Sequence, residues 1–542
     1  MGARAFGAPL PIDHGGGVKR GLHTFIGLVL VVILSWPDTS HYFAQGVITS
    51  ARWTGTWAAA PDVTADPGFN NQTIRHVVHT SIGGTAARLT FSNLFGTKPI
   101  TLGDVHIARR ASGARTVAGT DKAATFNGQP YVTIPVGGTV QTDAIPFQVP
   151  ALTDIVVSFH IPSQTPPGST GHIEGLQDNW IAPGDVSADP AFTGGVVNAA
   201  GEQSYYFLTN VDVMNAAATG AVVTFGASIT DGVASTPNTN RRWPNRLAER
   251  LIRSGMTVGV LNQGISGNDF FTNGSGQAGL TRFARDVLGQ PNVKWVIVSD
   301  DAVNNLISGN PPSAQQLIGA YQQLVQQTAA AKVGLICSTL TPFQGLDEWT
   351  PEIENTRQTV NAYLRSKASG CDAVLDQAAA LGNPVGTDDS TAFVRAYNSG
   401  DDLHPDDTGM QAIANAVDLG WFAALPPINA PTACGRIAMG EGLAEGQSVA
   451  ACGGNVQLSL RSDGYLVAVM NGATIWSSHV SGTPGVEVRM QEDGNLAMYD
   501  NNGAMVWQTH TSGNPGAFAD ILSNGYLVIF SARGTALWSS QG

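Results

Sequence analysis

The chain has 542 residues, of which 13% are charged, 43% are hydrophobic and 64 are glycines. This length suits about three or four domains, and the low charge with abundant glycine argues against a disordered chain or a helical bundle. The formal net charge is −13 and no basic stripe occurs, so we expect no nucleic-acid partner.

Residues 1–45 have the pattern of an export signal. Lys19 and Arg20 precede an apolar run at 25–36, which has the length of a signal-peptide core and is short for a membrane span. An uncleaved N-terminal anchor is the alternative, and the cleavage site stays open, with Ala44 as one candidate. No second long apolar run follows. We therefore expect a secreted protein, extracellular or periplasmic, with no stable membrane span after signal removal.

The cysteine count is even, which permits disulfides in an exported protein. Cys434 and Cys452 flank a short loop at the start of the last module and are the favoured pair. Cys337 and Cys371 lie in or just before expected core strands. Their state is left open between a disulfide and two buried thiols.

Residues 50–215 are rich in Thr, Val and Gly, with short alternating apolar runs such as 87–91 and 155–159. Glycine pairs at 83–84 and 137–138 separate such runs. This pattern predicts an antiparallel β-sandwich, here an accessory domain.

Residues 218–427 alternate expected strands with helices of 3.6-residue periodicity. The expected strands are 222–225, 258–261, 295–298, 333–336 and 373–375, and the expected helices are 242–254, one capped by Ser313, and one near 354–369. This alternation predicts an α/β domain whose parallel sheet is covered on both faces. Sites in such sheets lie beyond the carboxyl ends of the strands.

A Pro-rich linker at 428–433 leads into residues 434–542, where the chain repeats itself. Trp476, Trp507 and Trp538 recur at a fixed interval of 31 residues, each in a similar phrase. Three copies predict three equivalent β units that pack on one core through these tryptophans. The whole is thus a multidomain chain.

Three residues have the types needed for nucleophilic catalysis. Ser228 directly follows the first expected strand of the α/β domain, within FGASITDG. Near the end of that domain, the phrase DDLHPDDTGM contains Asp401 and His404. A serine hydroxyl needs a base to take its proton, and histidine does this near neutral pH when a carboxylate orients it.

These phrases resemble the sequence blocks of SGNH/GDSL hydrolases. FGASITDG is similar to the first block, the phrase at 262–268 to the second, the phrase at 295–306 to the third, and DDLHPDDTGM to the last. The resemblance implies a flavodoxin-like three-layer fold and a triad of Ser228, His404 and Asp401. It also implies an oxyanion hole made by Ser228, Gly267 and Asn304, with Asn305 as the alternative in another register.

The chain departs from the family pattern in two blocks. Ala227 replaces the usual aspartate beside the serine, which is expected to loosen that loop without removing a triad member. In the third block Ala302 and Asn305 replace the usual glycine and aspartate, and the block is one residue longer. A misplaced oxyanion amide would slow the enzyme, since one such donor is worth about 10²- to 10³-fold in rate.

The sandwich and the repeats carry further resemblances. Phrases at 53–57, 72–84 and 89–103 are similar to the N-terminal β domain of multidomain SGNH enzymes associated with plant-polysaccharide degradation. His76 and His79 there are expected on opposite strand faces, which argues against a shared ligand. No HExxH or clustered CxxC occurs, so no metal or other cofactor is expected.

The repeats resemble bulb-type mannose-binding lectins, which form a β-prism and bind sugar through QxDxNxVxY. The middle repeat keeps four polar groups of that phrase, with Ala497 at the valine position, and these are Gln491, Asp493, Asn495 and Tyr499. The first and third repeats have lost most of the phrase. The resemblance therefore implies one site for a mannose-type glycan.

Three functions compete at this point. The first is a secreted serine esterase that removes acyl groups, acetyl foremost, from a polysaccharide or other ester. The second is a glycan-binding protein whose hydrolase domain has weakened or lost activity, which the altered first and third blocks favour. The third is a lipase or lysophospholipase of the same family, although no obvious apolar lid supports it.

Overall fold

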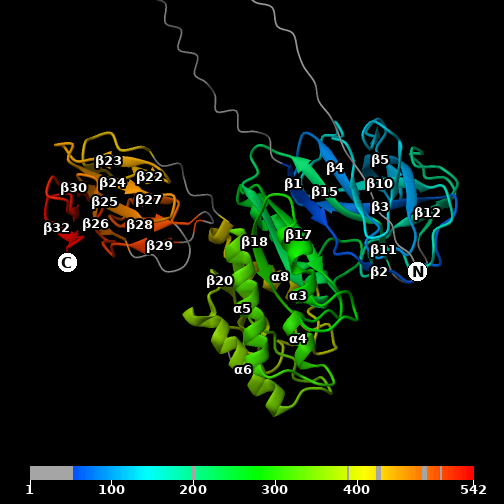
Figure 1. The fold of residues 1–542 in the computed structure, drawn as a ribbon. Helices are drawn as coiled ribbons and strands as arrows, with labels where there is room; N and C mark the ends of the chain where they lie inside the picture. Colours follow the sequence, from blue (N-terminus) through cyan, green and yellow to red (C-terminus); the bar gives the residue numbers. More distant parts are fainter. Residues whose placement is uncertain are drawn as a thin grey trace, which may run out of the picture. The chain divides into compact units, whose positions relative to one another are not determined.

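The computed structural model describes residues 53–197, 203–386, 390–422, 429–478, 485–500, 503 and 505–541. The expected signal segment lies outside these residues, as does part of the expected linker. Within the described ranges, every helix is too short or too polar to cross a membrane. Figure 1 shows three groups of elements in chain order, one all-β, one of parallel strands with helices, and a second all-β group.

The first group is the predicted β-rich region. Its main sheets have the strand orders β1-β15-β4-β9 and β13-β12-β3-β10-β5-β6, and β14-β11-β2 forms a small third sheet. The strands are β1 Trp53–Ala58, β2 Asp62–Val63, β3 Gln72–Thr80, β4 Ala87–Ser92, β5 Ile100–Ser112, β6 Arg115–Thr116, β7 Lys122–Ala123, β8 Tyr131–Ile134, β9 Thr139–Gln141, β10 Thr153–Ile161, β11 Thr170–His172, β12 Trp180–Pro183, β13 Val196–Val197, β14 Tyr205–Tyr206 and β15 Leu208–Met214.

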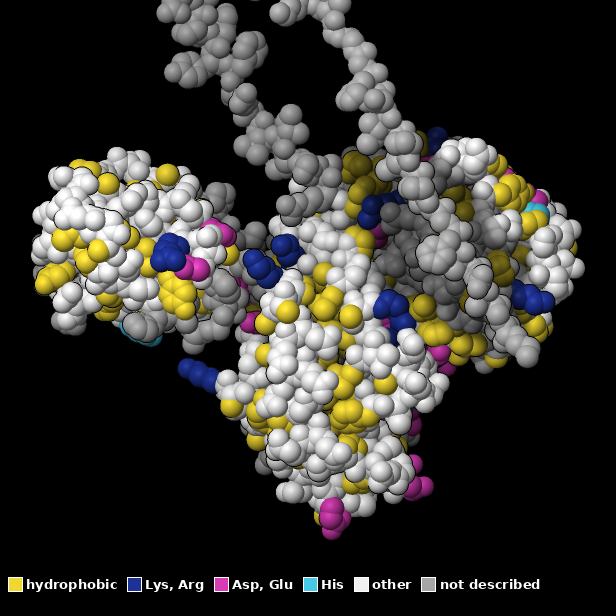
Figure 2. Space-filling model, in the orientation of Figure 1, with side chains coloured by type: hydrophobic (Ala, Val, Ile, Leu, Met, Phe, Trp, Pro, Cys, Tyr) yellow, Lys and Arg dark blue, Asp and Glu magenta, His cyan; other side chains and the backbone are white. Residues whose placement is uncertain are grey.

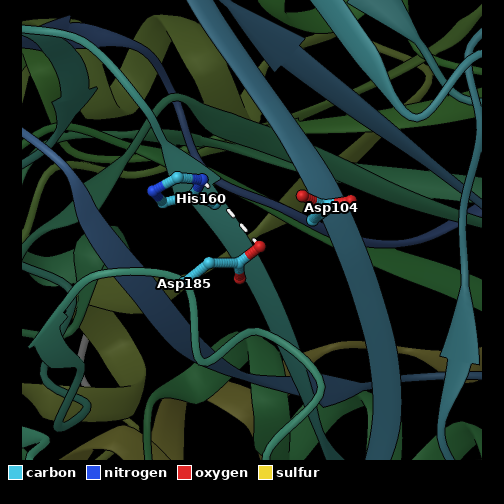
Figure 3. A group of neighbouring side chains, drawn as sticks. All are labelled: Asp104, His160 and Asp185. Atoms are coloured by element: carbon cyan, nitrogen blue, oxygen red, sulfur yellow. Dashed lines mark ion pairs between the residues drawn. The ribbon is translucent and has the colours of Figure 1, made fainter.

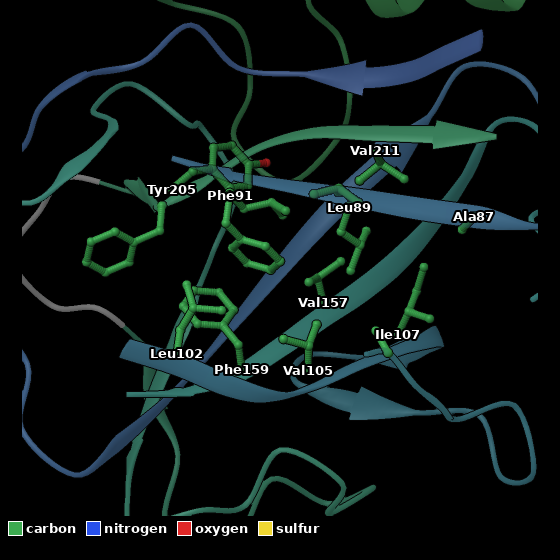
Figure 4. Close-up of a cluster of buried hydrophobic side chains, with 14 of the residues drawn as sticks. Ala87, Leu89, Phe91, Leu102, Val105, Ile107, Val157, Phe159, Tyr205 and Val211 are labelled. Atoms are coloured by element: carbon green, nitrogen blue, oxygen red, sulfur yellow. The ribbon is translucent and has the colours of Figure 1, made fainter. Parts of the chain in front are cut away.

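Alternate residues of the two main sheets meet in one core. Leu89 and Phe91 of β4 face Val157 and Phe159 of β10, all of them fully buried (Figure 4). The rings of Phe91 and Phe159 lie edge to face, with centroids 5.1 Å apart. Such packing of two antiparallel sheets is a β-sandwich, so the predicted fold of this region is confirmed.

The second group is the predicted α/β domain, with a five-stranded sheet in the order β17-β16-β18-β19-β20. All four strand pairs are parallel. The strands are β16 Gly220–Gly226, β17 Val258–Gly264, β18 Val293–Val298, β19 Gly334–Ser338 and β20 Ala373–Leu375. The helices are α1 Ser228–Asp231, α2 Trp243–Arg253, α3 Gly279–Phe283, η1 Ala284–Leu288, α4 Asp301–Leu306, α5 Ala314–Ala331, α6 Pro351–Arg365, η2 Lys367–Ser369, α7 Gln377–Leu381, α8 Asp407–Ala416 and η3 Leu419–Phe422.

Helices cover both faces of this sheet, because neighbouring strand residues point to opposite sides. Val223 packs into the cluster that contains α5 and α6, whereas Val222 packs into the cluster that contains α2 and α8. Helix α5 begins as expected, since the Ser313 hydroxyl accepts from the backbone of Gln316 in a capping box. Cys337 and Cys371, whose state the sequence leaves open, form a disulfide.

The sandwich is hydrogen-bonded to the edge of the parallel sheet. Ser81 Oγ accepts from the backbone N–H of Val260 at 3.0 Å, and Asn292 donates to Thr54 Oγ1 at 2.9 Å. Strand β1 approaches β17 so closely that a Cβ on Gly259 would lie 2.1 Å from the carbonyl oxygen of Gly55. This contact brings sandwich residues next to the loops of the α/β domain.

The C-terminal group contains three four-stranded antiparallel sheets, β21-β30-β31-β32, β22-β27-β28-β29 and β23-β24-β25-β26. The three tryptophan rings stack edge to face with centroids 5.9–6.1 Å apart, as the 31-residue period predicts. Cys434 and Cys452 form the favoured disulfide. The strands are β21 Arg436–Ile437, β22 Gly442–Ala444, β23 Ser448–Ala450, β24 Val456–Leu460, β25 Leu466–Met470, β26 Ala473–Ser477, β27 Glu487–Met490, β28 Leu496–Tyr499, β29 Met505–Gln508, β30 Phe518–Ile521, β31 Leu527–Phe530 and β32 Ala536–Ser539.

Candidate active site

Ser228 lies at the first turn beyond the carboxyl end of β16. Ser228 is 7% exposed and is the first residue of the short helix α1, Ser228–Asp231. Two residues earlier, a Cβ on Gly226 would stand 2.3 Å from both Asp300 Oδ1 and Thr230 Oγ1, so only glycine fits there. This tight turn holds the serine at the edge of the sheet where sites of such domains lie.

A line of hydrogen bonds joins Ser228 to His404 and Asp401. His404 Nε2 lies 2.8 Å from Ser228 Oγ, and His404 Nδ1 lies 2.6 Å from Asp401 Oδ2. Because an ionised carboxylate only accepts, Nδ1 donates to Asp401, which leaves Nε2 to accept the serine proton. The geometry is that of a nucleophile, a base and an orienting acid.

Asp401 is held in its ionised form. Its other oxygen accepts from the backbone N–H groups of Leu403 and His404 at 3.0 and 2.8 Å. Partial burial alone would raise the pKa of Asp401, but the hydrogen bonds from the His404 backbone and imidazole and from Leu403 lower it to about 2. This carboxylate therefore stays charged at any pH at which the imidazole can act as a base.

Gly267 lies in the turn after β17 with a φ of +78°, a conformation that favours glycine. A Cβ there would also lie 2.6 Å from Ser275 Oγ. The start of this turn is tied to the end of β16, since the Ile265 N–H donates to the Gly226 carbonyl at 3.1 Å. The predicted oxyanion glycine is thus on a turn fixed beside the nucleophile loop.

The two candidate asparagines on α4 differ in their contacts. Asn305 is buried, accepts from the Phe270 N–H at 3.1 Å and donates to Asp269 at 2.9 Å. Asn304 is less buried and donates to the carbonyl oxygen of Asn268 at 2.8 Å, next to Gly267. Because Asn304 is the less buried of the two and donates next to Gly267, this geometry favours Asn304 over Asn305 as the oxyanion donor.

A second carboxylate takes the place of the one that Ala227 lacks. Asp300 is 3% exposed and accepts from the Ile229 N–H at 2.7 Å and from Thr230 Oγ1 at 2.5 Å. Burial raises the pKa of Asp300, while hydrogen bonds from Thr230 and from the backbone of Ala227 and Ile229 act in the opposite direction. Asp300, which follows β18, therefore holds the nucleophile loop in which Ala227 offers no carboxylate.

Residues 224–412 match the model of the GDSL-like Lipase/Acylhydrolase family. The chain carries a GDSL-like acylhydrolase domain. This match spans Ser228, Gly267, Asn304, Asp401 and His404, together with the end of β16 and all of β17, β18, β19 and β20.

No curated protein matches the chain. Similar solved structures include a G-D-S-L family protein from Desulfitobacterium hafniense DCB-2, with 21% identity over 36% of this chain and 96% of that one and a TM-score of 0.28. They also include an acetyl xylan esterase, with 19% identity over 36% of this chain and 96% of that one and a TM-score of 0.28. A mannose-binding lectin from Gastrodia elata is 27% identical over 19% of this chain and 93% of its own, with a TM-score of 0.18.

The sandwich contributes a histidine to the loops of the GDSL-like domain. His172 Nε2 lies 2.9 Å from Asp231 Oδ1, and the other Asp231 oxygen accepts from Ser266 N and Oγ, both at 3.0 Å. Burial alone would lower the pKa of His172, but the charge of Asp231 raises it. This bridge fixes Ser266, the residue before Gly267.

A cavity of about 330 Å³ opens beside this bridge. Sandwich residues line one side of it and residues of the second block line the other. Its polar lining comprises Asp62, His172, Glu174, Asp231, Ser266 and Ser275. Since Ser275 also contacts the Gly267 position, the cavity lies next to the predicted oxyanion turn.

In the middle repeat, the structure brings two of the predicted sugar ligands together directly. Gln491 Nε2 donates to the Tyr499 hydroxyl at 2.5 Å, and Asp493 accepts from the Asn495 N–H at 3.0 Å. Asn495 itself is 1% exposed, and its side chain donates to Gln508 at 2.9 Å. Asn495 therefore shapes the turn, and its backbone pairs with Asp493 and Gln491.

Sequence reasoning missed Asp300, His172 and Arg282. Arg282 is fully buried and donates to the carbonyl oxygens of Gly226 and Gln263 and to Asn268 Oδ1, at 2.7–2.9 Å. It thereby joins the ends of β16 and β17 to the Gly267 turn. Its local phrase, GLTRF, gives no signal for such a role, since its partners lie 14 or more positions away in the sequence.

Proposed function

We propose that this protein is a secreted serine esterase that removes acyl groups, acetyl foremost, from a carbohydrate. The observation that carries the proposal is the unbroken hydrogen-bond line from Ser228 through His404 to Asp401. A serine with that partner and a carboxylate ionised down to about pH 2 has what acyl transfer requires.

The reaction follows from this geometry. Ser228 Oγ attacks the ester carbonyl while His404 Nε2 takes its proton, and Asp401 stabilises the imidazolium. The negative oxygen of the tetrahedral intermediate accepts from the N–H groups of Ser228 and Gly267 and from the Asn304 amide. His404 then gives the proton to the departing alcohol, and water releases the acid from the acyl-serine by the same steps.

The lining of the cavity beside Gly267 supports a carbohydrate as the alcohol part of the ester. Asp62 and Glu174 present carboxylates there, and Ser266 and Ser275 present hydroxyls. Such groups can pair with sugar hydroxyls, whereas a lipid chain offers them no hydrogen bond.

Replacing Asp62 or Glu174 with alanine should raise KM for an acetylated oligosaccharide by about tenfold, because each loses a hydrogen bond worth about 1 kcal/mol or more to the sugar. The same variants should hydrolyse nitrophenyl acetate like the parent, since that ester has no sugar. Acetate release and nitrophenol release measure the two reactions. Equal loss on both substrates, or on neither, would contradict a sugar subsite in this cavity.

The C-terminal module is proposed to hold the enzyme on a mannose-type glycan through one weak site. The middle repeat alone keeps Gln491, Asp493 and Tyr499 around a common turn. The first repeat has Arg461 and Tyr465 at the positions of Gln491 and Asn495, and the third has Leu522 and Tyr526. Neither offers the same set of hydrogen-bonding groups.

Asp493→Ala should weaken mannan binding by about ten- to a hundredfold, because a sugar hydroxyl loses its acceptor in a desolvated contact. Asn524→Ala, at the equivalent position of the third repeat, is the matched control and should bind like the parent. Calorimetric titration of the full chain with a mannan fragment gives the affinity and the stoichiometry of binding. A stoichiometry near three, or unchanged binding in Asp493→Ala, would refute the single site.

A further inference from the structure

Three side chains from distant parts of the sandwich gather at one point (Figure 3). Asp104 comes from β5, His160 from β10 and Asp185 from the loop after β12. One ligand atom from each, a carboxylate oxygen or an imidazole nitrogen, lies within 4.8 Å of the others. None of the three belongs to the proposed esterase site.

His160 presents an unused nitrogen to this group. Its side chain is 9% exposed, and its Nε2 lies 3.0 Å from Asn71 Oδ1. Because an amide oxygen only accepts, Nε2 carries the proton and a neutral ring has its lone pair on Nδ1. That Nδ1 is buried without a hydrogen bond and lies 3.9 Å from Asp185 Oδ2. A buried lone pair facing a carboxylate is unfavourable unless a proton or a metal cation lies between them.

The two aspartates are oriented by neighbours of their own. The Tyr131 hydroxyl donates to Asp104 Oδ2, and Ser187 donates to Asp185 Oδ1 from both N and Oγ, at 3.1 and 2.6 Å. The pairing of β10 with β5 shifts register between Ser158 and His160, opposite Asp104. This bulge turns Asp104 out of the regular alternation of its strand.

We propose that Asp104, His160 and Asp185 bind a divalent transition-metal ion, with Zn²⁺ as the expected occupant. One imidazole and two carboxylates form a mixed nitrogen and oxygen set that suits Zn²⁺, whereas Ca²⁺ and Mg²⁺ prefer oxygen ligands alone. Three protein ligands leave a position for water, and Asp185 is exposed on that side. Such an ion would fasten the loop after β12 to strands β5 and β10.

From the sequence we expect no metal because no short motif is present, whereas the ligands proposed here are at least 25 residues apart in the chain. Antiparallel pairing and a loop bring them together, so no local spacing could indicate them. Asn71 is the positioning residue of the site, since its hydrogen bond fixes which nitrogen of His160 is unprotonated.

The test is calorimetric titration of the chelator-treated, untagged full chain with ZnCl₂ and separately with CaCl₂. We expect one saturable Zn²⁺ equivalent, weakened at least about tenfold in Asp185→Asn and about 10- to 100-fold in Asn71→Gly. Asp185 is exposed and glycine accepts the φ of +48° at Asn71, so both variants should fold. Asp189→Asn, in the same loop, is the matched control and should bind like the parent.

Thermal unfolding gives an independent measurement, because an ion that binds only the folded state raises Tm. The rise with Zn²⁺ should occur in the parent and in Asp189→Asn and be lost in Asp185→Asn. No saturable Zn²⁺ binding by the parent, binding unchanged in Asp185→Asn, or a preference for Ca²⁺ would each overturn the proposal.

Discussion

Ser228→Ala is expected to lower kcat for a short-chain nitrophenyl ester by about 10⁵- to 10⁶-fold, as removal of the nucleophile does in other serine hydrolases. The remaining oxyanion donors and His404 cannot form an acyl intermediate without Oγ. Release of nitrophenol from purified protein measures the effect. Ser254→Ala is the control, because that serine is exposed at the end of α2 and should change neither kcat nor KM.

Two results would contradict the role of Ser228 as the nucleophile. Equal hydrolysis by the parent and Ser228→Ala would show that the domain has lost its chemistry, and the glycan-binding alternative would then stand. A parallel loss in Ser254→Ala would show that the assay reports folding rather than catalysis. Thermal unfolding of both variants separates a loss of catalysis from a loss of folding, since neither substitution removes packing from the core.

Asp300→Ala is expected to lower kcat by about 10²-fold with a smaller change in KM. The substitution leaves the N–H of Ile229 and the hydroxyl of Thr230 without their acceptor, at a cost of about 1–3 kcal/mol each. The nucleophile loop must then rearrange, and a displacement of about 1 Å at the reacting atom costs about 10²-fold in rate. Steady-state kinetics on nitrophenyl acetate measure kcat and KM separately.

A second substitution makes this result specific to the carboxylate. In the Asp300→Ala background, Ala227→Asp restores an acceptor that can reach the N–H two residues on, as aspartates do in turns, and should recover part of kcat. In the parent, Ala227→Asp places a second carboxylate in a site where Ala227 is fully buried beside Asp300, and should lower kcat. Activity that rises in the parent, or no recovery in the double variant, would contradict the role of Asp300.

Much of the fold could be predicted because its signals are local. The 31-residue period indicated that Trp476, Trp507 and Trp538 share one core, and the alternation of strands with helices indicated a parallel sheet with helices on both faces. The helix expected near 354–369 begins earlier, at Pro351, because Thr350 caps it and proline suits its first turn. Thr350 and Pro351 are thus the local sequence signal for the start of this helix.

The site was predictable where one phrase contains the partners, as with Asp401 and His404. The site was not predictable where a contact joins segments that are distant in the sequence. Asp300 resembles an ordinary helix cap in the sequence, yet its partners Ile229 and Thr230 are 70 or more positions away. His172 meets Asp231 through contact between two domains. On the face shown in Figure 2, lysine and arginine side chains are scattered singly, so surface charge indicates no site there.

In the proposed mechanism, Ser228 becomes the nucleophile through His404. The most direct test is the mass of the full chain, and of the peptide that contains Ser228, after reaction with a fluorophosphonate ester. We expect one adduct per chain on Ser228, formed much more slowly in His404→Ala and absent in Ser228→Ala. No adduct on the parent, or an adduct on another residue, would contradict it.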